Sequence, residues 1–161
     1  MDDEGAQTLL ATLLEQERTL QFARFSNEDA LQIGLQMIAA VRKLGKSASI
    51  SIVRCGQQLF QHAMAGTTPD NAEWIRRKEN VVLRFGHSSY YMGMYCRSIG
   101  STFEEHTGLD SQHFMAHGGC FPIILSGTGI VGTMTVSGMP QAEDHAVVTD
   151  VVRAYLLEAR V

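Results

Sequence analysis

The sequence predicts a single α+β domain in which helices pack on an antiparallel sheet. Two stretches of alternating apolar and polar residues each fold back through a turn, which is typical of β-hairpins. Amphipathic helical segments precede, separate and follow these hairpins. Hairpins placed among helices favour an antiparallel sheet over a doubly wound parallel one. The length of 161 residues suits one domain, and no repeat or linker divides residues 1–161.

Two helices are expected before the first hairpin. Residues 6–18 carry leucines at helical spacing, and the short segment 21–25 is predicted as an edge strand. Ser26 is the expected N-cap of the next helix, because Asp29 falls in its first turn, where the helix dipole favours an acid. Gly45 is the expected stop of that helix.

The first hairpin joins strands near 49–54 and 59–64 through a turn at 55–57. Because side chains alternate along a strand, Ile50 and Ile52 share one face. The opposite face takes Ser49, Ser51 and Val53.

Helices fill the middle of the chain. A loop with a hydroxyl and a proline leads into a helix from about residue 71 to 85. That helix is expected to bend or restart at 86–89, because glycine and serines weaken a helix interior. A second helix is expected over 90–99 and a short one over 102–108.

The second hairpin follows a loop at 110–119, with strands at 120–125 and 130–137, and a last helix covers 143–157. Its turn contains the pattern G-x-G-x-x-G at 127–132. A dinucleotide site needs a helix directly after such glycines, but the residues that follow are β-branched and alternate as in a strand. We therefore expect a hairpin turn and no nucleotide.

Composition excludes several classes of protein. The net charge of −4 gives no general attraction for nucleic acid or an anionic membrane. The longest stretch without a charged residue, 111–142, is interrupted by glycines and prolines, so no membrane span is expected. The N-terminus is acidic and lacks a signal sequence, and the three cysteines form no CxxC motif, which predicts a cytoplasmic protein with reduced thiols.

Two clusters are candidate ligand-binding residues. Trp74, Arg77 and Lys78 share a helix face, which is suited to a flat or anionic ligand, although a solvated charged face with a core Trp is the alternative. His117 precedes Gly118-Gly119, whose backbone amides are suited to an anion, although a tight turn explains them as well.

Histidines provide weaker candidates. His145 follows Asp144 in the first turn of the last helix, so that it is a candidate acid–base group, while helix capping explains the acid alone. His113 and His117 are four residues apart, but no zinc-ligand spacing surrounds them, and no metal is expected.

Three stretches together resemble an uncharacterised family within the GlcG/HbpS-like, or haem-degrading domain, group: 66–78, 116–123 and 132–145. The resemblance covers about residues 9–157 and treats 1–161 as one such domain. It implies a profilin-like or PAS-like α+β fold, a homo-oligomer and haem as a conceivable cofactor. The chain has Val53-Arg54-Cys55-Gly56 where the wider group often has an Asp before the first hairpin turn.

These observations leave three functions open. The first is binding or sensing of a small anionic or flat ligand, haem included. Its pocket would be built from the 67–71 loop, the Trp74–Lys78 helix face, the His117–Gly119 loop and the start of the last helix. The second is a haem-degrading or other small-molecule enzyme that uses His117 or His145. The third is an oligomeric scaffold, because methionines and low charge predict apolar surface that a small domain leaves uncovered.

Overall fold

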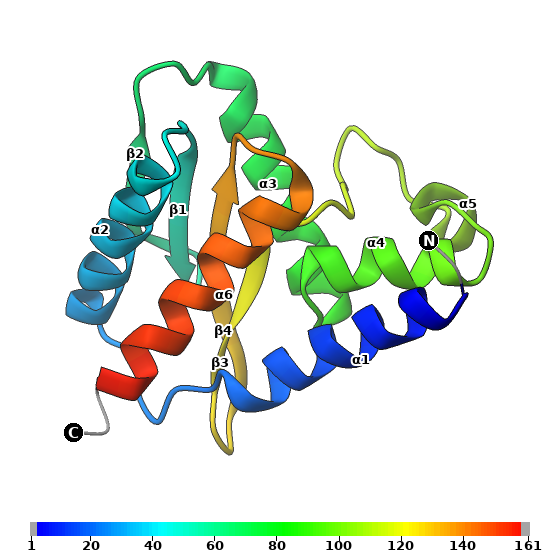
Figure 1. The fold of residues 1–161 in the computed structure, drawn as a ribbon, viewed down its shortest axis with the longest axis horizontal. Helices are drawn as coiled ribbons and strands as arrows, with labels where there is room; N and C mark the ends of the chain where they lie inside the picture. The colour runs from blue at the N-terminus through cyan, green and yellow to red at the C-terminus, as the bar shows by residue number, and fades with distance from the viewer. Residues whose placement is uncertain (1–2, 159–161) are drawn as a thin grey trace.

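A computed structural model describes residues 3–158 (Figure 1). Its elements follow the predicted order of helices and hairpins. They are α1 (Asp3–Thr19), α2 (Asn27–Lys43), β1 (Ser49–Arg54), β2 (Gln57–Ala63), α3 (Pro69–Phe85), α4 (Ser89–Ser98), α5 (Phe103–Thr107), β3 (Cys120–Leu125), β4 (Gly129–Ser137) and α6 (Gln141–Glu158). The predicted α+β class is confirmed.

The four strands form one antiparallel sheet in the order β2-β1-β4-β3. The two hairpins therefore meet through β1 and β4, where Ile50 pairs with Val136 and Ser51 with Thr135. On the other side of β4, Cys120 pairs with Thr135. The central strands β1 and β4 thus place polar residues of both hairpins side by side.

Helices cover both faces of the sheet. In Figure 1, α2 and α6 lie in front of the strands and α3 lies behind them. Helices α1 and α4 pack against each other beside the sheet. Both hairpins therefore supply a face to α3 and a face to the α2–α6 layer.

The two faces differ sharply in composition. The face under α2 and α6 carries fully buried apolar side chains, namely Ile50, Ile52, Phe121, Ile123, Met134 and Val136. The face under α3 carries buried hydroxyls and a thiol, namely Ser49, Ser51, Cys120, Thr133, Thr135 and Ser137. We call these the apolar face and the polar face. The alternation predicted for β1 is confirmed on both.

Three local expectations have clear outcomes. The segment 21–25 is not a regular strand, since it makes a single parallel bridge between Phe22 and Leu125. The helix over 71–85 ends at Gly86, which is left-handed with φ 73°, and the chain restarts after Ser88, whose hydroxyl accepts from the Tyr91 amide. Each predicted helix is present, with ends shifted by a few residues.

The glycines at 127–132 form a turn followed by a strand, as predicted. No helix begins after them, because β4 starts at Gly129. Gly132 serves close strand packing, since a Cβ there would lie 1.9 Å from the Val53 carbonyl oxygen. The absence of nucleotide binding stays a prediction. Among residues 3–158, the helices are all too short or too polar to cross a bilayer.

Candidate functional site

A cavity of about 210 Å³ opens between the start of α3, the loop before β3 and the start of α6. Its lining comprises Asp70, Asn71, Trp74, Lys78, His117, Gly118, Ser137, Gly138, Met139, Gln141 and Asp144. Three stretches that lie far apart in the chain, 70–78, 117–118 and 137–144, meet here. Whether these residues bind a ligand stays a prediction.

The first turn of α3 forms one wall. Pro69 occupies the first helical turn, where its missing amide hydrogen costs nothing, and the Thr68 amide donates to the Asn71 side chain at 2.9 Å. Asn71 in turn donates to the Ser137 carbonyl oxygen at 3.2 Å, which ties α3 to the end of β4. The Trp74 indole donates to Asp70 at 3.1 Å, which holds the ring against this wall.

A buried ion pair lies at the floor of the cavity. The Lys78 amine donates to Asp144 Oδ2 at 3.1 Å and to the Val136 carbonyl oxygen at 3.2 Å, and both side chains are 3% exposed. Asp144 also accepts from the Gly138 and Met139 amides. Burial lowers the pKa of Lys78, although Asp144 opposes that change, and burial raises the pKa of Asp144 against the pull of Lys78.

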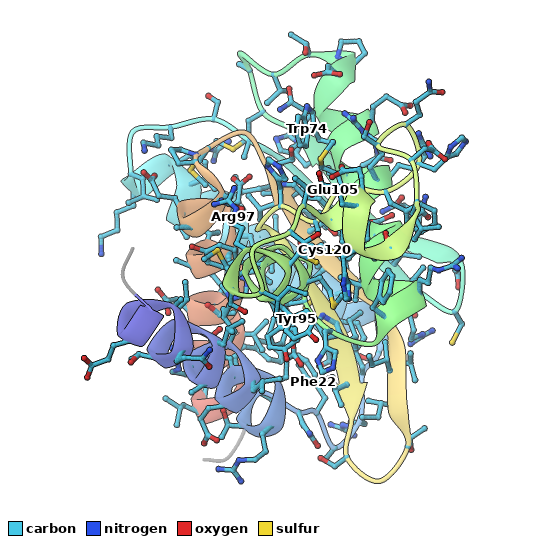
Figure 2. All side chains as sticks on the ribbon, turned by 90° about the vertical axis from the view of Figure 1, so that its right-hand side faces the viewer. Phe22, Trp74, Tyr95, Arg97, Glu105 and Cys120 are labelled. Carbon is cyan, nitrogen blue, oxygen red and sulfur yellow. The ribbon has the colours of Figure 1, made fainter. Side chains whose placement is uncertain are left out.

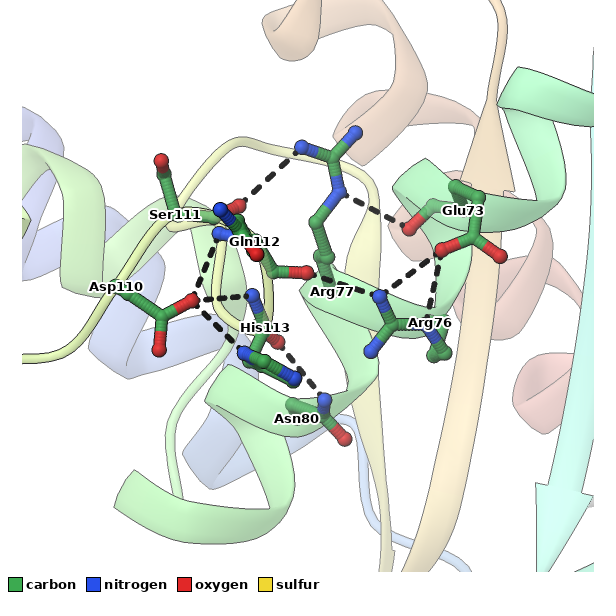
Figure 3. Close-up of polar contacts among 8 residues, drawn as sticks. All are labelled: Glu73, Arg76, Arg77, Asn80, Asp110, Ser111, Gln112 and His113. Atoms are coloured by element: carbon green, nitrogen blue, oxygen red, sulfur yellow. Dashed lines mark hydrogen bonds and ion pairs between the residues drawn. The ribbon is translucent and has the colours of Figure 1, made fainter.

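The loop that carries His117 is held along α3 by hydrogen bonds to its backbone (Figure 3). Arg76 donates to the Gln112 carbonyl oxygen at 2.9 Å, Arg77 to that of Ser111 at 3.3 Å and Asn80 to that of His113 at 2.8 Å. Asp110 also accepts from the Gln112 and His113 amides. The basic run on α3 thus positions this loop.

Each glycine of the loop is required by a close approach. A Cβ on Gly118 would lie 2.1 Å from the Gln141 carbonyl oxygen. A Cβ on Gly119, which has φ +124°, would lie 2.7 Å from the Lys78 nitrogen. The Gly118 amide donates to the Gln141 side chain at 3.2 Å. The loop therefore packs directly on the start of α6 and on the buried ion pair.

His117 is half-buried, and its ring lies 5.3 Å from the Trp74 ring. Burial lowers the pKa of His117, and the Lys78 charge adds to the effect, so the ring is neutral at pH 7. It lines a second cavity of about 180 Å³ as well, together with Arg97. In Figure 2, Trp74 lies near the top of the view and Cys120 near the middle.

The structure does not bring Arg77 or His145 into the lining of the cavity. The Arg77 guanidinium lies 4.6 Å from the centre of the Trp74 ring and holds the loop, and the Gly118 amide is taken by Gln141. The expectation that Arg77 and the His117–Gly119 loop line one pocket is therefore met by His117 and Gly118 and not by Arg77. Arg77 supports the cavity from behind Trp74.

His145 lies on the other side of α6, because successive helix residues point about 100° apart. Its ring is 3% exposed, between Tyr90 and Phe121, and its Nε2 lies 2.8 Å from Gln16 Oε1. Burial lowers its pKa to about 4. Its Nδ1 has no partner among residues 3–158.

Sequence reasoning missed the role of Asp144 and the residues that precede α6. Asp144 was explained as an acid in a first helical turn, yet it pairs with a lysine 66 residues earlier. Ser137, Gly138 and Gln141 lie within the 132–145 stretch of the resemblance, but no chemical signature there pointed to a ligand, and the order of the strands brings them to the cavity. No group of three or more metal-ligating side chains occurs among the described residues.

The cavity leaves several hydrogen-bond donors free. Both carboxylates of the lining already accept bonds, Asp70 from Trp74 and Asp144 from Lys78. The His117 ring, the Ser137 hydroxyl and the Gln141 side-chain amide nitrogen donate to no other group among residues 3–158. The backbone amide of Gln141, in the first turn of α6, also lacks an acceptor there. Such a site is complementary to a ligand rich in oxygen acceptors.

The fold is that of an α+β domain with an antiparallel sheet. The cavity is a small polar site lined by three stretches of the chain. Residues 25–153 match the family model described as haem degrading protein HbpS-like. The chain belongs to this HbpS-like family, and the resemblance inferred from its motifs is confirmed.

Comparisons with individual proteins agree. UPF0303 protein SCO2848 of Streptomyces coelicolor is 46% identical over 149 residues, which cover 92% of this chain and 94% of that protein. The crystal structure of Ybr137w protein is 32% identical, with a TM-score of 0.87 and coverage of 94% of this chain and 90% of that one. A PduOC:heme complex shares the fold at 16% identity, with a TM-score of 0.67 over 81% of this chain and 94% of that one.

Proposed function

We propose that this protein binds a small anionic compound rich in oxygen, such as a short-chain carboxylate, in the cavity between α3, the His117 loop and α6. The observation that carries the proposal is the set of free donors around a buried amine. The volume of about 210 Å³ is below the ~300–1,000 Å³ of pockets for drug-sized ligands, which favours a small compound. The start of α6 adds a helix N-terminus, which favours negative charge.

Haem does not fit this cavity, despite the family description and the haem complex of PduOC. The cavity is small, and its walls approach so closely at Gly118 and Gly119 that a Cβ on either would clash with a main-chain oxygen. Its floor is a polar ion pair, whereas haem needs a flat apolar slot. His117 is the histidine of the lining, and its ring faces Trp74. The proposal therefore assigns no haem chemistry to this site.

Binding by His117 is tested against its neighbour His113. Calorimetric titration with propionate, malonate and inorganic phosphate is the measurement. His117→Ala is expected to weaken binding by roughly tenfold, the loss of one hydrogen bond to a charged group of about 1.5 kcal/mol. His113→Ala is the matched control, because His113 lies on the same loop but is exposed and pairs with Asp110 at 2.8 Å.

Two outcomes contradict the proposal. One is no saturable binding of any of the three anions. The other is a haem absorption band in the wild type that His117→Ala abolishes and His113→Ala preserves, which would make the cavity a haem site. Equal losses in the two variants would show that the loop, and not the His117 side chain, is needed.

A homo-oligomer in the cytoplasm remains part of the proposal. Leu31 and Leu35 lie one turn apart on α2 and are 41% and 50% exposed, which is typical of surface that a partner covers. The three cysteines are free thiols, as a reducing compartment leaves them. Light scattering that returned the 17.7 kDa monomer at micromolar concentration would contradict the oligomer.

A further inference from the structure

Lys78 is unusual because it is a buried amine that faces a cavity. It stands in the middle of α3 and has two acceptors, the Asp144 carboxylate at the start of α6 and the Val136 carbonyl oxygen of β4. A lysine nitrogen has three hydrogens when charged, or two and a lone pair when neutral. Two of its positions are taken by these acceptors, and the third has no partner among residues 3–158. Lys78 and Asp144 both belong to the lining of the cavity.

The surroundings of this amine bring a neutral form within reach. Removing a charge from water is costly, so burial weakens the hold of Lys78 on its proton and strengthens that of Asp144. Moving the proton across their 3.1 Å hydrogen bond leaves a neutral amine beside a neutral carboxylic acid. Buried lysines of this kind are the nucleophiles that form Schiff bases with carbonyl compounds.

The residues around the pair leave space for a reacting group. Gly119 lacks the side chain that would otherwise press on the Lys78 nitrogen. His117 and Gln141 offer donors at the same cavity, so a carboxylate on the ligand has partners separate from the amine. The cavity therefore combines an acceptor-binding wall with a nucleophile at its floor.

We propose that Lys78 captures a small 2-oxo acid or aldehyde in this cavity as a Schiff base. The inference rests on the proposed function, because it names the class of small oxygen-rich compound that enters. The amine nitrogen attacks the carbonyl carbon, a C–N bond forms, and the carbonyl electron pair moves to the oxygen, which takes a proton from Asp144. The nitrogen, now positively charged, gives one of its two protons back to Asp144. The C–O bond then breaks as Asp144 protonates the hydroxyl, water leaves, and the nitrogen gives its second proton to Asp144. The net change is the loss of one water, and no oxidant is required.

The chain is favourable for a test because it has three lysines, Lys43, Lys46 and Lys78. Both Lys43 and Lys46 are exposed, and Lys46 pairs with Glu143, so Lys43 reports the reactivity of an ordinary lysine in the same sample. The native protein is incubated with pyruvate or glyoxylate and limiting sodium cyanoborohydride, which converts an imine into a stable secondary amine. Peptide mass mapping then measures the adduct at each lysine.

The expected result is an adduct at Lys78 that forms at least about tenfold faster than at Lys43, because the cavity holds the carbonyl compound beside the amine and burial lowers the pKa of Lys78. Propionate, which has no carbonyl carbon open to an amine, is expected to slow labelling at Lys78 by competition and to leave Lys43 unchanged. Lys78→Arg keeps the charge and is expected to lose the adduct. The pH profile of wild-type labelling checks the exchange of the proton with Asp144, since Asp144→Asn is expected to shift it.

Failure of this inference is distinguishable from failure of the proposed function. If propionate and pyruvate bind equally well by calorimetry while Lys78 stays unlabelled, the binding site stands and the Schiff base is wrong. If neither compound binds and Lys78 is no faster than Lys43, both proposals are wrong. Should Lys78→Arg unfold, the comparison among the three lysines of the wild type decides alone.

Discussion

The two faces of the sheet bury similar numbers of residues with opposite chemistry. The apolar face under α2 and α6 interlocks Ile, Val, Met and Phe side chains, which the hydrophobic effect stabilises without directional demands. The polar face under α3 buries hydroxyls, a thiol and the Lys78–Asp144 pair, which stabilise the fold only when every partner is in place. The cavity opens beside the polar face. From this difference we expect the apolar layer to carry most of the stability and the polar layer to carry the chemistry.

The largest expected effect comes from breaking the ion pair. Lys78→Met leaves Asp144 buried without its cation, which is expected to cost about 3–5 kcal/mol of unfolding free energy. The double variant Lys78→Met with Asp144→Leu removes both charges and is expected to recover most of that loss. Urea denaturation of the two variants and the wild type measures the difference. A double variant as unstable as the single one would show that the pair itself holds the polar layer together.

Truncation on the apolar face is the next largest effect. Ile52→Ala is expected to destabilise the protein by about 2–5 kcal/mol, because Ile52 is fully buried and a cavity would remain. Ser51→Ala, at the neighbouring position on the polar face, removes a hydroxyl that donates to Glu79 and accepts from Gln58, and it is expected to cost about 1–2 kcal/mol. The same urea titration compares them. Equal losses of unfolding free energy would contradict the expectation that the apolar face contributes more to stability than the polar face.

Acid is expected to destabilise the protein by protonating His145 on α6. The pKa of His145 is lowered to about 4 in the folded state, so the unfolded chain binds its proton first as pH falls. The contribution of neutral His145 to the free energy of unfolding is therefore fully present above about pH 6.5. It is lost as the pH falls towards 4, by about 3 kcal/mol in total. His145→Phe is expected to flatten this decline. His113→Ala is the control, since that histidine is exposed, and a flattened profile there would place the acid sensitivity elsewhere.

The smallest effect compares two adjacent residues of β4 that point to opposite faces. Val136→Thr puts a hydroxyl among apolar side chains and is expected to cost about 1–3 kcal/mol. Thr135→Val removes a hydroxyl that bonds Cys120 and Glu79 and is expected to cost about 0.5–1.5 kcal/mol. Thermal melting of both variants measures the pair. A larger loss from Thr135→Val would mean that the hydroxyl network outweighs the apolar packing.

Much of the fold follows from local patterns in the sequence. Alternation placed Ile50 and Ile52 opposite Ser51, and Gly86 marked the break between α3 and α4. The strand predicted around Phe22 was wrong, because apolar spacing alone does not distinguish a strand from a single bridge to Leu125. That distinction depends on whether neighbouring backbone groups find partners along the whole segment.

The candidate site was predictable in its location and less so in its detail. Trp74 and Lys78 belong to one helix face in the sequence and in the structure, and Arg77 was expected beside them. A lysine is almost never buried without a partner, so nothing local indicated that Lys78 turns towards the sheet. Its partner Asp144 lies 66 residues away, and only the pairing of β4 with β1 and β3 brings the start of α6 above the middle of α3. Such long-range contacts leave no periodic signal.

The rate at which the Cys120 thiol is labelled reports the motion of α3 over the polar face. Cys120 is fully buried beneath that helix, and burial raises the pKa of its thiol, so a thiol reagent reaches it only when the layer opens. Cys55 is exposed in the first hairpin turn, so its labelling rate is that of an accessible thiol. It serves as the reference for Cys120 in the same molecule. The ratio of the two labelling rates then reports how readily the layer around Cys120 opens. Because α3 also lines the cavity, a compound that binds there is expected to slow the labelling of Cys120.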